Sequence, residues 1–214
     1  QMKRLPRIGL VDTSTSNIKS VFYALKEFNC DVVEIKNFKD QTNIDAMVVP
    51  GIGSFDFVMK KLKQNKLDHL IYKSIEKGIP SLFICVGMQI LFSESYEFGK
   101  HKGLNIFKGK VKKIKKLNNK KDTRKIPFIG WNKLIVKKKC KILKNIKNNE
   151  FFYFTHSYYA EPKDKKIIST KTNYHDFKYC SSVSSDNIFA TQFHPEKSGH
   201  SGLKIYKDFV NLVS

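Results

Sequence analysis

The 214-residue sequence contains only four cysteines, and they lie far apart at Cys30, Cys85, Cys140 and Cys180. No two of them form a Cys-x-x-Cys pair, so we expect neither a disulfide framework nor a metal site. No apolar run approaches the ~18 residues that span a bilayer, and the first residues lack the apolar core of a signal peptide. These absences predict a cytoplasmic protein with no membrane partner.

Acidic residues are also scarce, since 19 Asp and Glu face 40 Lys and Arg and give a formal charge of +21. Clustered lysine is typical of phosphate binding, which raises the possibility of nucleic acid as a partner. However, no zinc finger, RNP-type motif or basic repeat accompanies the charge, and the lysines gather in polar stretches at 108–125 and 137–147. We therefore expect a solvated basic surface and no nucleic-acid partner.

The order of apolar patterns predicts the fold class. Short apolar runs alternate with helical spacing in the first half, which is typical of βαβ units and a parallel sheet. From 106 to 193 the runs are short and strand-like, at 126–129, 134–136, 151–154, 166–170 and 188–193, and an amphipathic helix closes the chain. With 41% hydrophobic residues and no linker, residues 2–214 are predicted to form a single α/β domain with one open, mostly parallel or mixed sheet flanked by helices. The predicted strands of the first half are 8–11, 32–35, 46–49 and 81–84, and the predicted helix faces are Ile18 to Phe28, Leu67 to Ile75 and Leu203 to Val213.

Cys85 stands directly after a predicted buried strand, with Gly87 two residues later. Ligands of open α/β sheets bind beyond the carboxyl ends of the strands, and a sharp strand-to-helix turn displays a side chain there. Backbone N–H groups at such a turn favour a thiolate and can stabilise an oxyanion. Taken alone, Cys85 still fits a buried structural thiol better, because free cysteine is among the most buried residue types.

A candidate base lies near the end of the chain, in Gln192-Phe193-His194-Pro195-Glu196. In an extended chain, residues two apart face the same side, so Glu196 is expected beside His194, where it can orient the imidazole. An imidazole held in this way can activate a thiol. His-x-Glu is common by chance, and the fold alone can bring it to Cys85.

Further motifs accompany these residues, and the five together occur in the order seen in triad glutamine amidotransferases. Over nearly its whole length the chain resembles the glutaminase subunits of imidazole glycerol phosphate synthases. The motifs are Pro50-Gly51-Ile52-Gly53-Ser54-Phe55, Cys85-Val86-Gly87-Met88-Gln89, Gly130-Trp131-Asn132, His156-Ser157-Tyr158 and Gln192-Phe193-His194-Pro195-Glu196-Lys197-Ser198.

The resemblance implies a class I (triad) glutamine amidotransferase fold and a role for each matching residue. Cys85 is then the nucleophile, His194 the base and Glu196 its orienting carboxylate. No cofactor is implied, and the expected partners are glutamine and a cyclase or synthase subunit in a heterodimer. The remaining residues fall into three implied sets, namely oxyanion stabilisation by Gly51, Ile52, Gly53 and Val86, glutamine binding by Gln89, Glu97, His156, Ser157 and Tyr158, and the partner interface at Asn17, Trp131, Tyr153 and Lys197.

Two positions depart from the family's pattern. Phe83 stands two residues before the nucleophile, where the family has glycine, so different packing is expected beneath the turn. The first loop, residues 12–17, keeps Asn17 but lacks the family's glycines. Because that loop faces the synthase in the family, the change bears on partner choice.

The resemblance predicts that glutamine is hydrolysed to glutamate and that the ammonia passes to a barrel-type synthase of histidine biosynthesis. Three alternatives stay open. The altered first loop suits a paralogue that serves amidation of a surface-polysaccharide sugar, and Phe83 suits a non-catalytic interaction subunit of the same fold. A cysteine peptidase is a poorer fit, because Gln89 and Glu97 suit a glutamine pocket better than an open peptide cleft.

Overall fold

An eight-stranded mixed sheet forms the centre of the computed structural model, which describes residues 4–14, 18–40, 43–115 and 125–214. Five neighbouring strands are parallel, and the last three pair antiparallel. In spatial order the strands are β2 (Asp31–Ile35), β1 (Arg7–Val11), β3 (Ala46–Gly51), β4 (Ser81–Cys85), β14 (Ile188–Thr191), β13 (Phe177–Ser185), β12 (Ile168–Tyr174) and β9 (Ile135–Val136).

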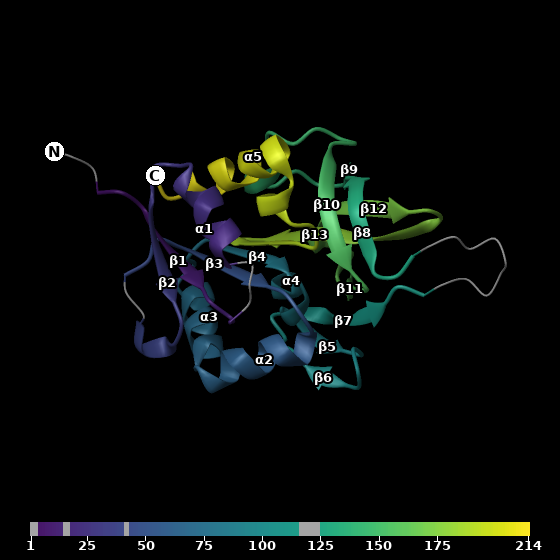
Figure 1. The fold of residues 1–214 in the computed structure, drawn as a ribbon, viewed down its shortest axis with the longest axis horizontal. Helices are drawn as coiled ribbons and strands as arrows, with labels where there is room; N and C mark the ends of the chain where they lie inside the picture. Colours follow the sequence, from purple (N-terminus) through teal and green to yellow (C-terminus); the bar gives the residue numbers. More distant parts are fainter. Residues whose placement is uncertain (1–3, 15–17, 41–42, 116–124) are drawn as a thin grey trace.

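Helices cover both faces of this sheet, which explains why every residue of β3 and β4 is buried. The helices α1 (Ile18–Lys26) and α5 (Gly199–Val210) lie together on one face, whereas α2 (Phe55–Gln64) and α3 (Leu67–Glu76) lie on the other (Figure 1). The short α4 (Val86–Ile90) follows β4 directly. Among the described residues, no helix is both long and apolar enough to cross a membrane.

The helix faces predicted from the sequence are largely those that are buried. In α3 the buried side chains include Leu67, Leu70 and Ile71, and Gly78 follows the helix with a φ of 70°. The first helix ends at Lys26, so Phe28 lies beyond it. Ser16 and Asn17, which precede this helix in the sequence, lie outside the described residues.

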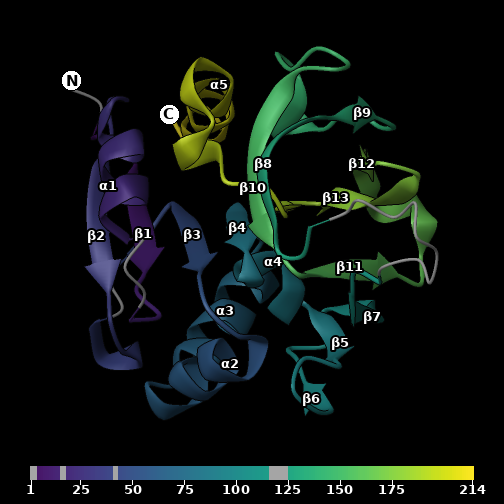
Figure 2. The same cartoon turned by 45° about the vertical axis from the view of Figure 1, so that its right-hand side comes forward.

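Two smaller sheets accompany the main sheet, whereas the sequence predicted one sheet. One is the antiparallel pair β8 (Phe128–Lys133) and β10 (Phe151–His156). The other contains β11 (Tyr158–Pro162), β7 (Phe107–Lys113), β5 (Phe92–Ser95) and β6 (His101–Lys102). Figure 2 shows β8 and β10 rising between α5 and β12, with the second small sheet on the side of α2. The four 3-10 turns of the described chain are η1 (Phe38–Asp40), η2 (Lys141–Leu143), η3 (Lys165–Ile167) and η4 (Pro195–Lys197).

Candidate active site

Cys85 lies on a sharp turn between β4 and α4. Its φ of 57° and ψ of −111° are unusual for a residue with a side chain, and such strained backbone is found most often at functional sites. The turn requires glycine at position 87, because a Cβ there would lie 2.2 Å from the Val49 carbonyl oxygen. Gly51 is the register partner of Cys85, so β3 supports the turn directly.

Phe83 lies in β4 beneath this turn and is fully buried. Its register partners are Val49 on β3 and Ala190 on β14. The aromatic ring is therefore part of the hydrophobic core, and its bulk does not block the cavity in front of Cys85.

His194 reaches the same cavity from the other end of the chain. Its Nδ1 lies 2.7 Å from Oε1 of Glu196, and both side chains are buried. The sequence argument placed the pair on extended backbone, which is wrong, because Pro195 begins the turn η4. The turn still brings the two side chains together, and the backbone of His194 is fixed by hydrogen bonds from its N–H to the Tyr153 carbonyl and from the Ser198 hydroxyl to its own carbonyl.

The electrostatic surroundings favour a charged imidazole at position 194. Burial lowers the pKa of His194, but the negative charge of the Cys85 sulfur and the Glu196 carboxylate outweigh it and raise the pKa to about 10. Nδ1 is engaged by Glu196, whereas Nε2 makes no hydrogen bond with any residue of the described chain. Nε2 is therefore the ring nitrogen available for proton transfer.

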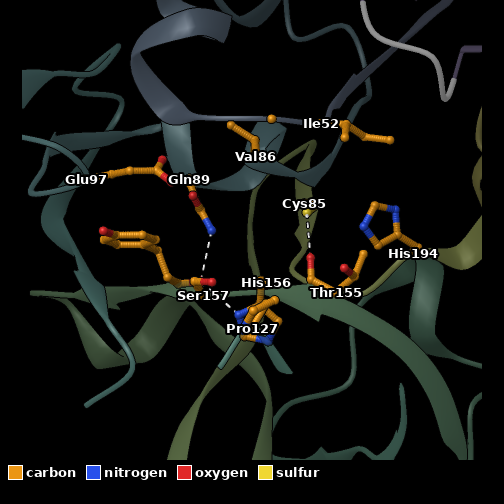
Figure 3. A pocket seen from close by; sticks show the side chains of 12 residues that line it. Ile52, Cys85, Val86, Gln89, Glu97, Pro127, Thr155, His156, Ser157 and His194 are labelled. Atoms are coloured by element: carbon orange, nitrogen blue, oxygen red, sulfur yellow. Dashed lines mark hydrogen bonds between the residues drawn. The ribbon is translucent and has the colours of Figure 1, made fainter. Parts of the chain in front are cut away.

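The two residues open into one cavity of about 240 Å³ (Figure 3). Cys85 and His194 lie at one end of the view, and Gln89 and Glu97 lie at the other. The cavity has a mixed polar and apolar lining and is of a size suited to a small substrate. Its lining residues are Ile52, Gly53, Cys85, Val86, Gln89, Glu97, Pro127, Thr155, His156, Ser157, Tyr158 and His194.

Three of the four residues expected to stabilise an oxyanion line this cavity, namely Ile52, Gly53 and Val86. Gly53 has a φ of 99°, a conformation that favours glycine. Gly51 is not among the lining residues. A Cβ on Gly51 would lie 2.9 Å from the Gly87 nitrogen, so this glycine allows β3 to pack closely against the turn.

The residues expected to bind glutamine all line the cavity, but three of their side chains also form hydrogen bonds within the protein. Gln89 donates from Nε2 to the Tyr158 carbonyl and to Oε1 of Gln192, both at 3.0 Å. Glu97 accepts from the backbone N–H of Phe55 at 2.7 Å, and burial raises its pKa. Gln89 therefore positions the segment at Tyr158, while Glu97 carries a carboxylate into the cavity.

His156 is also held within the protein. Its Nδ1 lies 2.8 Å from the Tyr158 carbonyl oxygen, and its Nε2 lies 3.1 Å from the Tyr179 hydroxyl. Burial lowers the pKa of His156 to about 4, so the ring is neutral at physiological pH. In this state Nδ1–H donates to the carbonyl and Nε2 accepts from the hydroxyl. The side chain thus fixes the backbone that faces the cavity.

Sequence reasoning gave no role to Gln192 or Thr155, which both contact the nucleophile. Gln192 donates from Nε2 to the Cys85 sulfur at 3.7 Å, and the Cys85 thiol lies 3.9 Å from the Thr155 carbonyl oxygen. Gln192 belongs to the same sequence motif as His194, and this was the one feature of the sequence that could have indicated its contact with Cys85. The Thr155 contact is made by a backbone carbonyl, so the identity of the side chain at this position could not have indicated it.

The residues expected at a partner interface form a cluster, apart from Asn17, which lies outside the described residues. The rings of Trp131 and Tyr153 pack edge to face with centroids 6.0 Å apart, and Nζ of Lys197 lies 5.9 Å from the Tyr153 ring centroid. Trp131 is 54% exposed. Within the part of the chain that the structure describes, no group of three or more His, Cys, Asp or Glu side chains is arranged to hold a metal ion.

Comparison with known proteins gives consistent results. Residues 9–212 match the family described as glutamine amidotransferase class-I. The chain is 43% identical to the imidazole glycerol phosphate synthase subunit HisH of Pyrococcus furiosus, over 97% of this chain and 100% of that protein. It is 41% identical to the HisH subunit of Aquifex aeolicus, over 95% of each chain.

Two solved structures are similar in fold. One is a putative GMP synthase subunit from Thermoplasma acidophilum, with a TM-score of 0.72, 19% identity, and coverage of 99% of this chain and 95% of that one. The other is PurLQS from Thermotoga maritima, with a TM-score of 0.75, 18% identity, and coverage of 99% and 100%. At these identities the likeness concerns the fold alone.

Proposed function

The chain belongs to the class-I glutamine amidotransferases and, among them, to the family of HisH subunits of imidazole glycerol phosphate synthase, and on this premise we propose that Cys85, His194 and Glu196 hydrolyse glutamine. The observation that carries the proposal is the meeting of the Cys85 thiol and the His194–Glu196 pair in one cavity. The products are glutamate, which leaves the cavity, and ammonia, which a synthase subunit uses.

The reaction passes through a thioester. The Cys85 thiolate attacks the carboxamide carbon of glutamine, and the carbonyl oxygen becomes an oxyanion. His194, which holds a proton at neutral pH because of its raised pKa, protonates the departing ammonia from Nε2. Water then attacks the thioester with His194 as the base, and glutamate is released. Glu196 holds the imidazole in orientation and stabilises its positive charge throughout.

The cavity supplies groups for each part of the substrate. Backbone N–H groups at Val86 and Gly53 border the nucleophile and suit an oxyanion. The Glu97 carboxylate and the backbone of residues 156–158 border the far end, where a glutamine α-amino and α-carboxylate group would lie. Because Gln89 and His156 are held in the protein, their contribution is to fix that backbone in place.

We place the partner surface on the outer face of the β8–β10 sheet. The register pairs Trp131 with Tyr153 and Lys133 with Phe151, so these side chains share one face. Ile129 and Phe151 on that face are 60% and 49% exposed. An exposed cluster of large apolar and aromatic side chains is typical of a protein interface. The same strand carries Thr155 to the cavity, so the surface lies beside the reaction centre.

We propose that the partner is the cyclase subunit of imidazole glycerol phosphate synthase, because the HisH proteins compared above are named as subunits of that enzyme. Ammonia released into neutral water would be protonated, so transfer through the protein interior is required. Activity without an acceptor would waste glutamine, and the isolated chain should therefore hydrolyse glutamine slowly until the loaded cyclase is present. Steady-state glutamate release with and without the cyclase measures this activation.

The decisive test replaces the nucleophile. Cys85→Ala should abolish glutamate release from glutamine, His194→Ala should reduce it nearly as far, and Glu196→Ala should reduce it in part. Full activity of Cys85→Ala would refute the assignment.

Complementation of a strain lacking its HisH subunit then tests the pathway. Growth without histidine supports the cyclase as partner, while failure with an intact glutaminase points to another synthase, such as one that amidates a surface sugar.

A further inference from the structure

Tyr206 is a buried polar residue that the proposed mechanism leaves without a role. It lies on α5, and its side chain is fully buried. A phenol normally finds a hydrogen-bond partner when it is buried, because an unpaired hydroxyl away from water costs free energy. Among the described residues, the Tyr206 hydroxyl has no hydrogen-bond partner of ordinary distance and angle. The position of Tyr206 therefore needs an explanation.

The close packing of α5 on η4 determines what the phenol faces. Gly202 approaches Pro195 so closely that a Cβ on the glycine would lie 1.8 Å from the Pro195 carbonyl oxygen. Tyr206 follows Gly202 by four residues and so lies on the same side of the helix, one turn further on. Pro195 stands next to Glu196 in η4. The glycine contact thus brings the face of α5 that carries Tyr206 close to η4, in which Glu196 stands.

Electrostatics agrees with this placement. Burial raises the pKa of Tyr206 well above its ordinary value, and the charge of the nearby Glu196 carboxylate raises it further. The tyrosine is therefore protonated at neutral pH and can donate its hydroxyl proton. The Glu196 side chain is itself fully buried, and one of its oxygens, Oε1, is already engaged by His194.

We propose that Tyr206 is a positioning residue that donates a hydrogen bond to the Glu196 carboxylate and extends the triad to Cys85, His194, Glu196 and Tyr206. A hydrogen bond from the Tyr206 hydroxyl would restrict rotation of the carboxylate about its last bond and so help to fix its plane. The hydroxyl also stabilises a charge that is otherwise buried. This inference rests on the proposed glutaminase function, since Tyr206 acts on the reaction only through Glu196 and His194.

The test is a double-mutant cycle in the complex of the chain with the cyclase subunit. Tyr206→Phe removes the hydroxyl and keeps the ring. We expect kcat for glutamate release to fall about 5- to 20-fold with KM for glutamine unchanged, because the glutamine pocket is not touched. In a Glu196→Ala background, the same substitution should change kcat by less than about 2-fold, because the group through which it acts is gone.

Tyr72→Phe is the matched control. It removes a hydroxyl on α3 that donates to the Leu104 carbonyl, and neither residue lines the cavity. It should leave kcat unchanged in both backgrounds. Wild-type kcat in Tyr206→Phe, or an equal fold-loss in the Glu196→Ala background, would overturn the assignment. If Tyr206→Phe does not fold, Tyr206→Leu replaces it.

A second cycle separates this inference from the function on which it rests. The four proteins of the Tyr206 and Glu196 cycle are unfolded in urea, and the changes in the free energy of unfolding should be non-additive when the two side chains are in contact. Additive changes would overturn the contact. Absence of glutaminase activity in the wild-type complex would instead refute the proposed function, while the urea cycle still decides whether Tyr206 contacts Glu196.

Discussion

Cys85 and His194 reach the same cavity by two different structural means. The nucleophile is held by backbone in close contact, since Gly87 lies against the Val49 carbonyl and Cys85 itself adopts a positive φ. The base is held by polar side chains, since His194 is paired with Glu196 inside the protein. The first arrangement is sensitive to added volume, and the second is sensitive to the loss of a polar partner.

The largest effect is expected from adding volume on the nucleophile side. Gly87→Ala would place a methyl group 2.2 Å from the Val49 carbonyl oxygen. We expect a loss of about 3 kcal/mol in the free energy of unfolding and at least a ~100-fold drop in glutamate release, because Cys85 shifts with the turn. Urea unfolding and a glutaminase assay measure the two effects.

Gly78→Ala serves as the control for that substitution. Gly78 has a positive φ, which Gly87 does not, but the nearest atom to the missing Cβ of Gly78 is 4.0 Å away. Alanine there should cost about 1 kcal/mol of stability from backbone strain alone, with kcat unchanged. Equal behaviour of the two variants would show that close contact is not what holds the nucleophile.

The second effect is the removal of charge on the base side. Glu196→Gln should reduce kcat by about 10- to 100-fold, because the imidazole loses the carboxylate that orients it and stabilises its charge. The pKa of His194 should also fall. The alkaline limb of the pH profile of kcat should therefore move to lower pH, and a profile that does not move would show that Glu196 does not set this pKa.

The same substitution predicts a change in how stability depends on pH. The pKa of His194 is raised from 6.5 to about 10 in the folded chain. Its contribution to stability is therefore complete below about pH 6.5 and is lost as the pH rises through about 10. The loss of unfolding free energy between these values should be smaller in Glu196→Gln than in the wild type. Urea unfolding at several pH values measures the difference.

A smaller effect is expected at the partner surface. Ile129→Asp places a charge on the exposed apolar face of the β8–β10 sheet and should weaken binding of the cyclase by about 10-fold. Hydrolysis by the isolated chain should change little. Titration calorimetry measures the binding of the cyclase, and a glutaminase assay without the partner measures hydrolysis by the isolated chain. Unchanged binding would show that this face is not part of the interface. The control is Lys63→Asp in α2, a helix that lies against the main sheet and is not part of the β8–β10 sheet.

The smallest effect concerns backbone strain at the nucleophile. Cys85 has a φ of 57°, so glycine should be more stable than alanine at this position, by about 1 kcal/mol. Both variants lack the thiol and should be inactive, so the comparison isolates the backbone. A Tm of Cys85→Ala equal to or above that of Cys85→Gly would show that the turn is unstrained.

The two halves of the chain also differ in how far their fold could be predicted. The strands β1 to β4 were predicted from the sequence because helices cover both faces and leave continuous apolar runs. The strands of the second half were predicted only in part. For example, β7 was missed because it contains several lysines and few apolar residues and so resembles a solvated loop. Neither β5 nor β11 was predicted, and the division into three sheets depends on pairing between distant segments.

The proposed triad could be named from the sequence because its residues lie in motifs that match a known family. The roles of Gln192 and Tyr206 could not, since each depends on a tertiary contact with a distant segment. The local structure at Glu196 was predicted wrongly for a related reason. The spacing of two between His194 and Glu196 was interpreted as extended chain. Pro195, however, has a fixed φ that favours the turn η4.

The strand β10 carries two functions on its two faces. Phe152, Phe154 and His156 face the core and the cavity, while Phe151 and Tyr153 face outward. A single-residue insertion or deletion would exchange the two sets, placing core aromatics in solvent and surface residues in the core. Any engineered re-targeting of the proposed partner surface should therefore replace outward side chains of β10 at constant length.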